Sequence, residues 1–144
     1  MKLRPETRRR ARALQLLYSL DGDAAPDLDG AAAGLARLTG PEPGVTEEAM
    51  ALAGAVMAHR EALDRQVSDA ADNWRIDRVA IIERNILRLG IHELMVGVLP
   101  AKVVIDESLW LAHRFAGPKA PPFINGVLDR VARQLRPAEF AGAG

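Results

Sequence analysis

Four arginines close to the start of the chain, Arg8, Arg9, Arg10 and Arg12, are the side chains best suited to binding chemistry. A guanidinium group binds a phosphate through two parallel hydrogen bonds and also stacks on flat rings. The cluster therefore predicts an arm that binds RNA or DNA; the alternative is a solvated, charged terminus without a ligand. Gln15 extends this surface, because steps of four and three residues keep Arg8, Arg12 and Gln15 on one helical face.

The formal net charge of zero conceals an uneven distribution of charge along the chain. Residues 1–12 hold six basic side chains and one acidic, a net charge of +5, whereas residues 13–72 hold three basic and eleven acidic, a net charge of −8. Residues 73–144 hold ten basic and seven acidic side chains, a net charge of +3. Because attraction to phosphate acts over about 8–10 Å at physiological salt, the neutral total does not exclude nucleic-acid binding.

Two aromatic side chains stand where an unstacked base could pack on them, as single-stranded RNA requires. Tyr18 lies on the same predicted helix as the arginines, away from its apolar face. Phe123 stands at the start of the last predicted helix, ahead of its apolar register. Core packing is the equally simple interpretation of Phe123, and the sequence leaves both open.

Three further polar side chains extend the basic surface toward the C-terminal half. Lys102 and Lys119 stand at two predicted junctions between a loop and a helix. Asn125, followed by Gly126, offers backbone amides at a predicted helix start, where another backbone can approach closely. The alternative for this pair is a polar first turn with a glycine that permits tight helix packing.

Catalytic and metal chemistry find little support in the sequence. The chain has no cysteine, which excludes disulfides, thiolate metal sites and cysteine nucleophiles. His59, His92 and His113 fall on different predicted helices without metal-ligand spacing, and no phosphate-binding loop or nucleophile elbow is present. We therefore expect a protein that is not an enzyme and that holds no metal or cofactor.

The N-terminus lacks the apolar segment of a secretory signal, and no apolar run reaches the ~18 residues of a membrane span. We therefore expect a cytoplasmic location without membrane association.

Apolar residues recur at helical spacing along most of the chain, and no alternating strand pattern interrupts them. This pattern predicts an all-α fold of six to seven helices in two packed lobes, residues 1–72 and 73–137, within one domain, followed by a frayed tail at 138–144. The expected helices are 7–20, a short one at 31–38, a long one from Thr46 through Val67, one starting at Asn73 or Asp77, one from Pro100 to Phe115, and a last one after the proline-rich loop 117–122.

Trp110 lies opposite the apolar positions of its predicted helix. It either contacts a neighbouring helix or marks a surface for self-association.

Three blocks of sequence occur in an order and spacing found in one known family. They are RRRARALQLLY at residues 8–18, the run around IERNILRL at residues 82–89, and FINGVLD at residues 123–129, with Pro100 and the acidic pair Asp106-Glu107 between the last two. The chain resembles the NusB family of transcription antitermination factors along nearly its whole length, the exceptions being residues 21–45 and the tail.

The resemblance implies a two-lobed helical fold, no catalysis, and binding of the boxA element of ribosomal RNA transcripts. It implies a heterodimer with the ribosomal protein that doubles as NusE, which delivers RNA to the RNA polymerase elongation complex with other Nus factors. The residues implied to bind RNA are Arg8, Arg9, Arg10, Arg12, Gln15, Lys102, Lys119, Phe123 and Asn125. Those implied to face NusE are Tyr18, Glu83 and Arg84.

Two other functions share this fold. One is the RNA-binding N-terminal domain of a ribosomal RNA cytosine methyltransferase, and the other is a helical self-association module that acts without RNA. The sequence leaves open the preferred boxA sequence and whether the free protein is a monomer or a homodimer.

Overall fold

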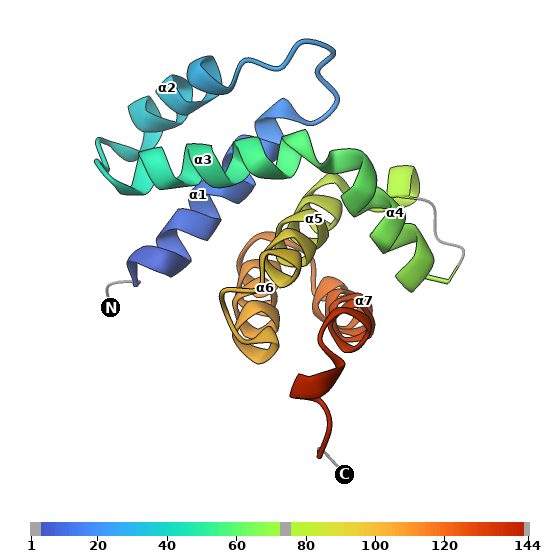
Figure 1. The fold of residues 1–144 in the computed structure, drawn as a ribbon. Coiled ribbons are helices and arrows are strands. Elements are labelled where there is room, and N and C mark those ends of the chain that lie inside the picture. The colour runs from blue at the N-terminus through green and yellow to red at the C-terminus, as the bar shows by residue number, and fades with distance from the viewer. Residues whose placement is uncertain (1–3, 73–75, 143–144) are drawn as a thin grey trace. The chain divides into compact units, whose positions relative to one another are not determined.

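The computed structural model describes residues 4–72 and 76–142, and within them every regular element is helical, as predicted (Figure 1). The elements are α1 (Pro5–Leu20), α2 (Leu28–Thr39), α3 (Val45–Ala58), α4 (Arg60–Ala70), the 3-10 turn η1 (Ile76–Arg78), α5 (Ile81–Val96), α6 (Ala101–Phe115), α7 (Ala120–Leu135) and the 3-10 turn η2 (Pro137–Glu139).

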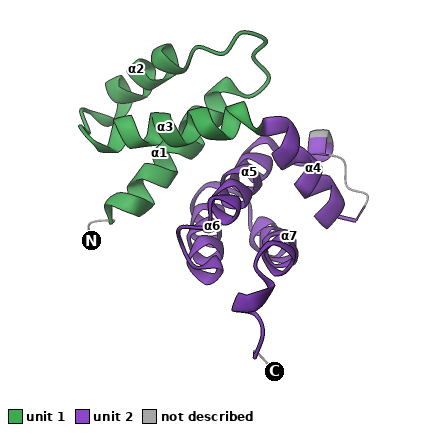
Figure 2. Cartoon of the chain, in the orientation of Figure 1, with its two compact units in different colours: residues 1–59 green, residues 60–144 purple. Residues whose placement is uncertain are grey.

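The chain divides into two compact units, residues 1–59 and residues 60–144 (Figure 2). The division lies at His59 and not near residue 72, because α4 packs against α5 and α7 and so belongs to the second unit. The single long helix predicted from Thr46 through Val67 is wrong: α3 ends at His59, with φ −111° and ψ 16°, and α4 begins at Arg60. Neither a glycine nor a proline stands at this break, and the helical spacing of apolar residues continues across it, so the sequence gives no sign of it.

Unit 1 consists of α1, α2 and α3, with α1 packed along α3. Helix α1 begins at Pro5, whose fixed φ suits a first helical turn, so the predicted start at Thr7 is two residues late. Ala49 and Ala53 of α3 are fully buried, and their small side chains permit α1 to approach closely. Helix α2 begins before the predicted residue 31, because the Asp27 carboxylate accepts a hydrogen bond from the Gly30 N–H at 3.0 Å and caps the helix.

Unit 2 is built around α5, which packs against α4, α6 and α7. Helix α5 begins at Ile81, later than predicted; Asn73 lies outside the described residues, and Asp77 belongs to η1. Gly90 permits the close packing here, since a Cβ at this position would lie 2.9 Å from Ser108 Oγ and 3.1 Å from Leu128 Cδ2. A larger residue at position 90 would force the Ser108 and Leu128 side chains to shift.

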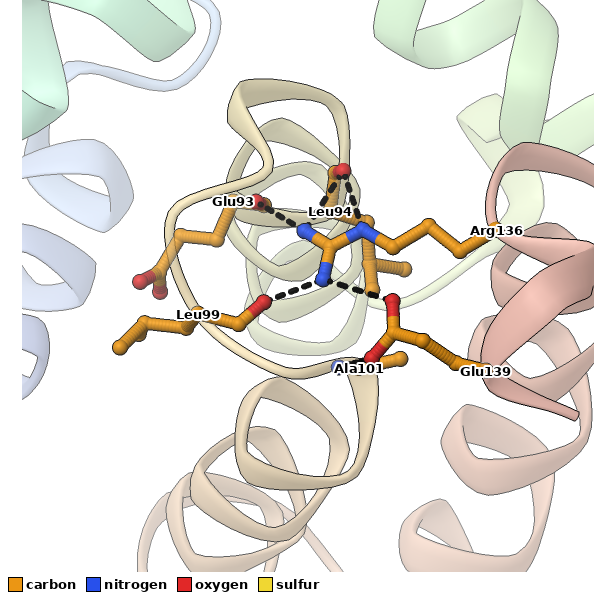
Figure 3. Close-up of polar contacts among 6 residues, drawn as sticks. All are labelled: Glu93, Leu94, Leu99, Ala101, Arg136 and Glu139. Atoms are coloured by element: carbon orange, nitrogen blue, oxygen red, sulfur yellow. Dashed lines mark hydrogen bonds and ion pairs between the residues drawn. The ribbon is translucent and has the colours of Figure 1, made fainter.

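The C-terminal residues 136–139 are ordered against unit 2, whereas the sequence predicted fraying from residue 138 (Figure 3). The Arg136 guanidinium donates to the carbonyls of Glu93 and Leu94 at the end of α5, at 2.9–3.2 Å, and to the Leu99 carbonyl. The Glu139 carboxylate accepts a hydrogen bond from the Ala101 N–H at 2.9 Å and pairs with Arg136 at 3.2 Å. We call this group the C-terminal clamp, because it caps the last carbonyls of α5 and the first amide of α6.

Candidate nucleic-acid interface

Three of the four arginines predicted to bind nucleic acid lie on the surface of α1 in unit 1 and pair with glutamates. Arg12 Nε lies 2.6 Å from Glu42 Oε1, and Arg8 Nε lies 3.7 Å from Glu42 Oε2. Arg9 Nη1 lies 3.1 Å from Glu48 Oε2 on α3. The charge of the arginine cluster is therefore partly neutralised within unit 1, which the sequence analysis did not predict.

These ion pairs leave the arginines available to a ligand. The side chains of Arg8, Arg9 and Arg12 remain 36%, 28% and 23% exposed, and the Glu48 side chain is 59% exposed. An exposed ion pair such as Arg9–Glu48 contributes only about 0–1 kcal/mol, so a phosphate, which accepts bidentate hydrogen bonds from guanidinium, can displace Glu48 at small cost. The Glu42 side chain, which pairs with Arg8 and Arg12, is only 13% exposed.

Arg10 does not belong to this surface, contrary to the sequence-based expectation. It is 2% exposed, and its Nη1 donates a hydrogen bond to the Glu6 carbonyl at 3.3 Å. Leu14 and Leu17, which follow Arg10 at spacings of four and seven residues, are also buried. Arg10 thus lies on an inward face of α1, and its guanidinium is not presented to an external phosphate.

Gln15 and Tyr18 occupy positions on α1 that suit contact with a ligand. The Gln15 carbonyl oxygen accepts a hydrogen bond from Arg12 Nη1 at 2.9 Å, which holds both side chains together on the predicted stripe. The Tyr18 residue is 52% exposed, a large exposed fraction for an aromatic residue. Its ring therefore lies off the core of unit 1, as predicted.

In unit 2 the predicted site residues divide by exposure. Lys102, Lys119 and Asn125 are exposed, and Phe123 is half-buried with contacts of its own. The ring of Phe123 is thus neither a fully buried core side chain nor an open platform.

Asn125 and Gly126 lie inside α7 and not at its start, because α7 begins at Ala120 with Pro121 and Pro122 in its first turn. The two amides therefore belong to the helix, and only the Asn125 side chain is offered to a ligand. A Cβ at position 126 would meet nothing within 4 Å, so tight packing does not explain this glycine either.

The predicted partner residues of unit 2 are Glu83 and Arg84, in the first turn of α5. Both are half-buried, and Arg84 takes part in further interactions. Glu83 lies at the positive end of the helix dipole, which stabilises a carboxylate there. Trp110 on α6 is also half-buried, so both alternatives drawn from the sequence, contact with a neighbouring helix and a surface for self-association, remain open.

Two groups of functional relevance escaped the sequence analysis. Glu42 and Glu48 lie 30 or more residues from the arginines that they contact. The acidic stretch that follows the basic start was the signal available in the sequence. The other group joins α4 to α5: Arg88 makes two hydrogen bonds with Asp64, at 2.6 and 3.0 Å, and one with Asn85 at 3.1 Å.

Within the described part of the chain, no group of three or more His, Cys, Asp or Glu side chains is arranged to hold a metal ion. Across the same residues, none of the helices combines the length and apolar character that crossing a membrane requires.

The fold and this surface define a small, all-helical protein of two units with a basic helix open to solvent. A family model described as NusB family matches residues 7–133, and the chain belongs to the NusB family. The resemblance stated from the sequence is thereby confirmed.

Relatives and solved structures agree with this assignment. The transcription antitermination protein NusB of Anaeromyxobacter dehalogenans is 41% identical over 133 residues, which cover 92% of this chain and 93% of that protein. The T. maritima NusB structure is similar with a TM-score of 0.78 and 26% identity, covering 98% of this chain and 99% of the other. A crystal structure of antitermination factors NusB and NusE in complex with double-stranded RNA has a TM-score of 0.80 and 25% identity, covering 92% of this chain and 99% of the matched chain.

Proposed function

We propose that this protein is a transcription antitermination factor that binds the boxA RNA of ribosomal RNA operon transcripts together with the NusE ribosomal protein. The observation that carries the proposal is the set of partly exposed guanidinium groups of Arg8, Arg9 and Arg12 on α1. The family supports the proposal, since a similar solved NusB is bound to NusE and RNA.

In this proposal the protein binds and does not catalyse. It acts in the cytoplasm, where the RNA–protein complex joins the RNA polymerase elongation complex and other Nus factors. The surface of α1 is modest and its charge is partly neutralised, so we expect weak binding of RNA by the protein alone. NusE adds surface and raises the effective affinity for the same RNA.

The RNA-binding site comprises the α1 residues Arg8, Arg9, Arg12 and Gln15, extended in unit 2 by Lys102, Lys119, Phe123 and Asn125. The NusE-facing residues are Tyr18, Glu83 and Arg84. Because Arg10 is buried, it supports the fold of α1 and is left out of the binding set.

Charge reversal of two exposed arginines tests the RNA site. Arg8→Glu with Arg9→Glu is expected to weaken boxA RNA binding by at least ~100-fold and to lower the salt dependence by about two phosphate contacts. Fluorescence anisotropy with a boxA RNA and a scrambled control, with and without NusE, measures both. The matched control is Arg60→Glu with Arg65→Glu, two exposed arginines of α4.

Unchanged RNA affinity of the α1 double variant would show that α1 is not part of the RNA-binding site. If both double variants weakened binding equally, the attraction would be general and the α1 site would be wrong. Helicity by circular dichroism shows that the variants remain folded.

Reversal of one carboxylate tests the partner surface. Glu83→Arg is expected to weaken NusE binding by at least ~10-fold, because truncation of a central interface charge commonly costs more than 1 kcal/mol. Isothermal titration calorimetry measures the affinity, with Glu61→Arg on α4, an exposed glutamate, as the matched control. Unchanged affinity for the Glu83 variant would remove this residue from the interface.

A further inference from the structure

A cavity of about 280 Å³ opens in unit 2 where α6 begins, between that helix, α7 and η2. Its apolar lining comes from Ala101, Ile105 and Phe140. The Arg133 guanidinium lies 4.6 Å from the centroid of the Phe140 ring, a cation–π contact that holds the ring in place. The cavity thus has a fixed aromatic wall.

Three carboxylates line the same cavity, and two of them are already neutralised by neighbours. Asp129 pairs with Arg133 at 3.0 Å. Glu139 belongs to the C-terminal clamp, where the Ala101 N–H and then the Arg136 guanidinium lower its pKa and keep it ionised. Both carboxylates therefore already have a cationic partner.

The remaining polar side chains, Lys102 and Asp106, are exposed and form no ion pair or side-chain hydrogen bond with the described residues. They stand one helical turn apart on α6, a spacing that places their Cβ atoms about 5–6 Å from each other. The cavity therefore offers one cationic donor and one anionic acceptor above an apolar wall, with no net charge. This balance suits a neutral, flat, polar ligand better than a phosphate or a basic side chain.

The size of the cavity further restricts the kinds of ligand that it can hold. Pockets for drug-sized molecules measure about 300–1,000 Å³, so this cavity fits a smaller ring system. Lys102 is part of the RNA surface proposed above, which brings unstacked bases of a bound strand to the mouth of the cavity. Single-stranded RNA is read by splaying bases onto aromatic walls and bonding their Watson–Crick edges.

We propose that this cavity holds one nucleobase of the bound RNA, and that Asp106 and Lys102 select guanine. The N1–H and N2 amino group of guanine are adjacent donors for the Asp106 carboxylate, while its O6 accepts from the Lys102 ammonium. Adenine, cytosine and uracil lack that pair of adjacent donors. The proposal rests on the RNA-binding function proposed above and adds to it a base-selective site.

Replacing Asp106 by asparagine separates this site from general electrostatics, because the two predict opposite signs. Removal of a negative charge beside an RNA surface strengthens binding when only charge matters. A guanine-reading carboxylate predicts that Asp106→Asn weakens binding by about 10-fold or more. The probe is a labelled boxA RNA titrated into the protein with NusE, and the control is Asp69→Asn, an exposed aspartate of α4.

A second RNA sharpens the test: the same strand with each guanosine replaced by inosine, which lacks the N2 amino group. Wild type should bind this RNA about 10-fold more weakly, and Asp106→Asn should bind both RNAs alike. Equal or tighter binding by Asp106→Asn, or equal wild-type affinity for the two RNAs, would overturn the base site while leaving the RNA-binding function intact. Failure of wild type to bind either RNA would overturn both.

Discussion

On α1, Arg8, Arg9 and Arg12 each pair with one glutamate, and their side chains stay 23–36% exposed. In unit 2, the Arg88 and Arg136 side chains are 10% and 12% exposed. The arginines of α1 pair with the carboxylates of Glu42 and Glu48, whereas Arg136 donates mainly to backbone carbonyls at the end of a helix. A carboxylate can rotate away when a phosphate arrives, but a helix carbonyl cannot.

The comparison teaches that an arginine-rich pattern alone does not distinguish a binding arginine from a structural one. What distinguishes them is the exposed fraction of the side chain, which is 23–36% for Arg8, Arg9 and Arg12 and 10–12% for Arg88 and Arg136. Arg10 makes the point within α1 itself, because it is flanked by binding candidates and yet is buried.

Reversal of Arg10 gives the largest expected effect and tests whether this residue belongs with the structural arginines. Arg10→Glu places a carboxylate at a buried position and should lower the free energy of unfolding by about 4 kcal/mol. Arg9→Glu, one residue away on the surface, should change it by no more than about 1 kcal/mol. Urea unfolding followed by circular dichroism measures both, and equal effects would erase the distinction between the two positions.

Removal of the Arg88 partner is expected to have the next largest effect. Asp64→Ala leaves the largely buried guanidinium without its bidentate acceptor, at a cost of about 3 kcal/mol. The control Asp69→Ala, at an exposed position on the same helix, should stay within about 0.5 kcal/mol of wild type. The same urea titration measures both variants. A loss of unfolding free energy below about 1 kcal/mol for Asp64→Ala would show that the Arg88–Asp64 pair does not stabilise the fold as proposed.

Neutralising Glu42 should move stability and RNA affinity in opposite directions. Glu42→Gln releases Arg12 and Arg8, which lowers the free energy of unfolding by about 1 kcal/mol and raises RNA affinity about fivefold through a local Coulomb change of similar size. Glu47→Gln, an exposed glutamate near the start of α3, is the control. A fall in RNA affinity would mean that Glu42 orients the arginines for RNA and does not compete with it.

Acidification should reveal the smallest effect, at the C-terminal clamp. The Ala101 N–H and Arg136 lower the pKa of Glu139 below its ordinary value of 4.5. A lowered folded-state pKa stabilises the protein fully above pH 4.5, and that stabilisation disappears as pH falls through the folded-state pKa. Thermal unfolding between pH 6 and pH 3 should thus show a steeper decline for wild type than for Glu139→Gln, and parallel curves would contradict the clamp.

Much of the fold was predictable, because apolar spacing and terminal signals act locally. Helices α1, α5, α6 and α7 follow from their buried leucines, isoleucines and valines, and Pro100 marks the start of α6. The break at His59 was not predictable, since no local breaker stands there and the division between the units comes from packing of α4.

The candidate site was predictable in its position but not in its details. The arginine cluster correctly indicated the position of the basic helix, because the residue type alone determines the chemistry of a guanidinium group. The pairing with Glu42 and Glu48 depends on contacts across 30 or more residues, and the burial of Arg10 depends on which way α1 faces. Neither property is encoded in local spacing.

The C-terminal clamp also sets an order of events during synthesis. Unit 1 has all of its helices once residue 59 has left the ribosome, so it can fold while translation continues. The ends of α5 and α6 acquire their caps only after residues 136–139 emerge. Unit 2 therefore matures last, and a nascent chain halted before residue 136 carries a complete unit 1 and an incomplete unit 2.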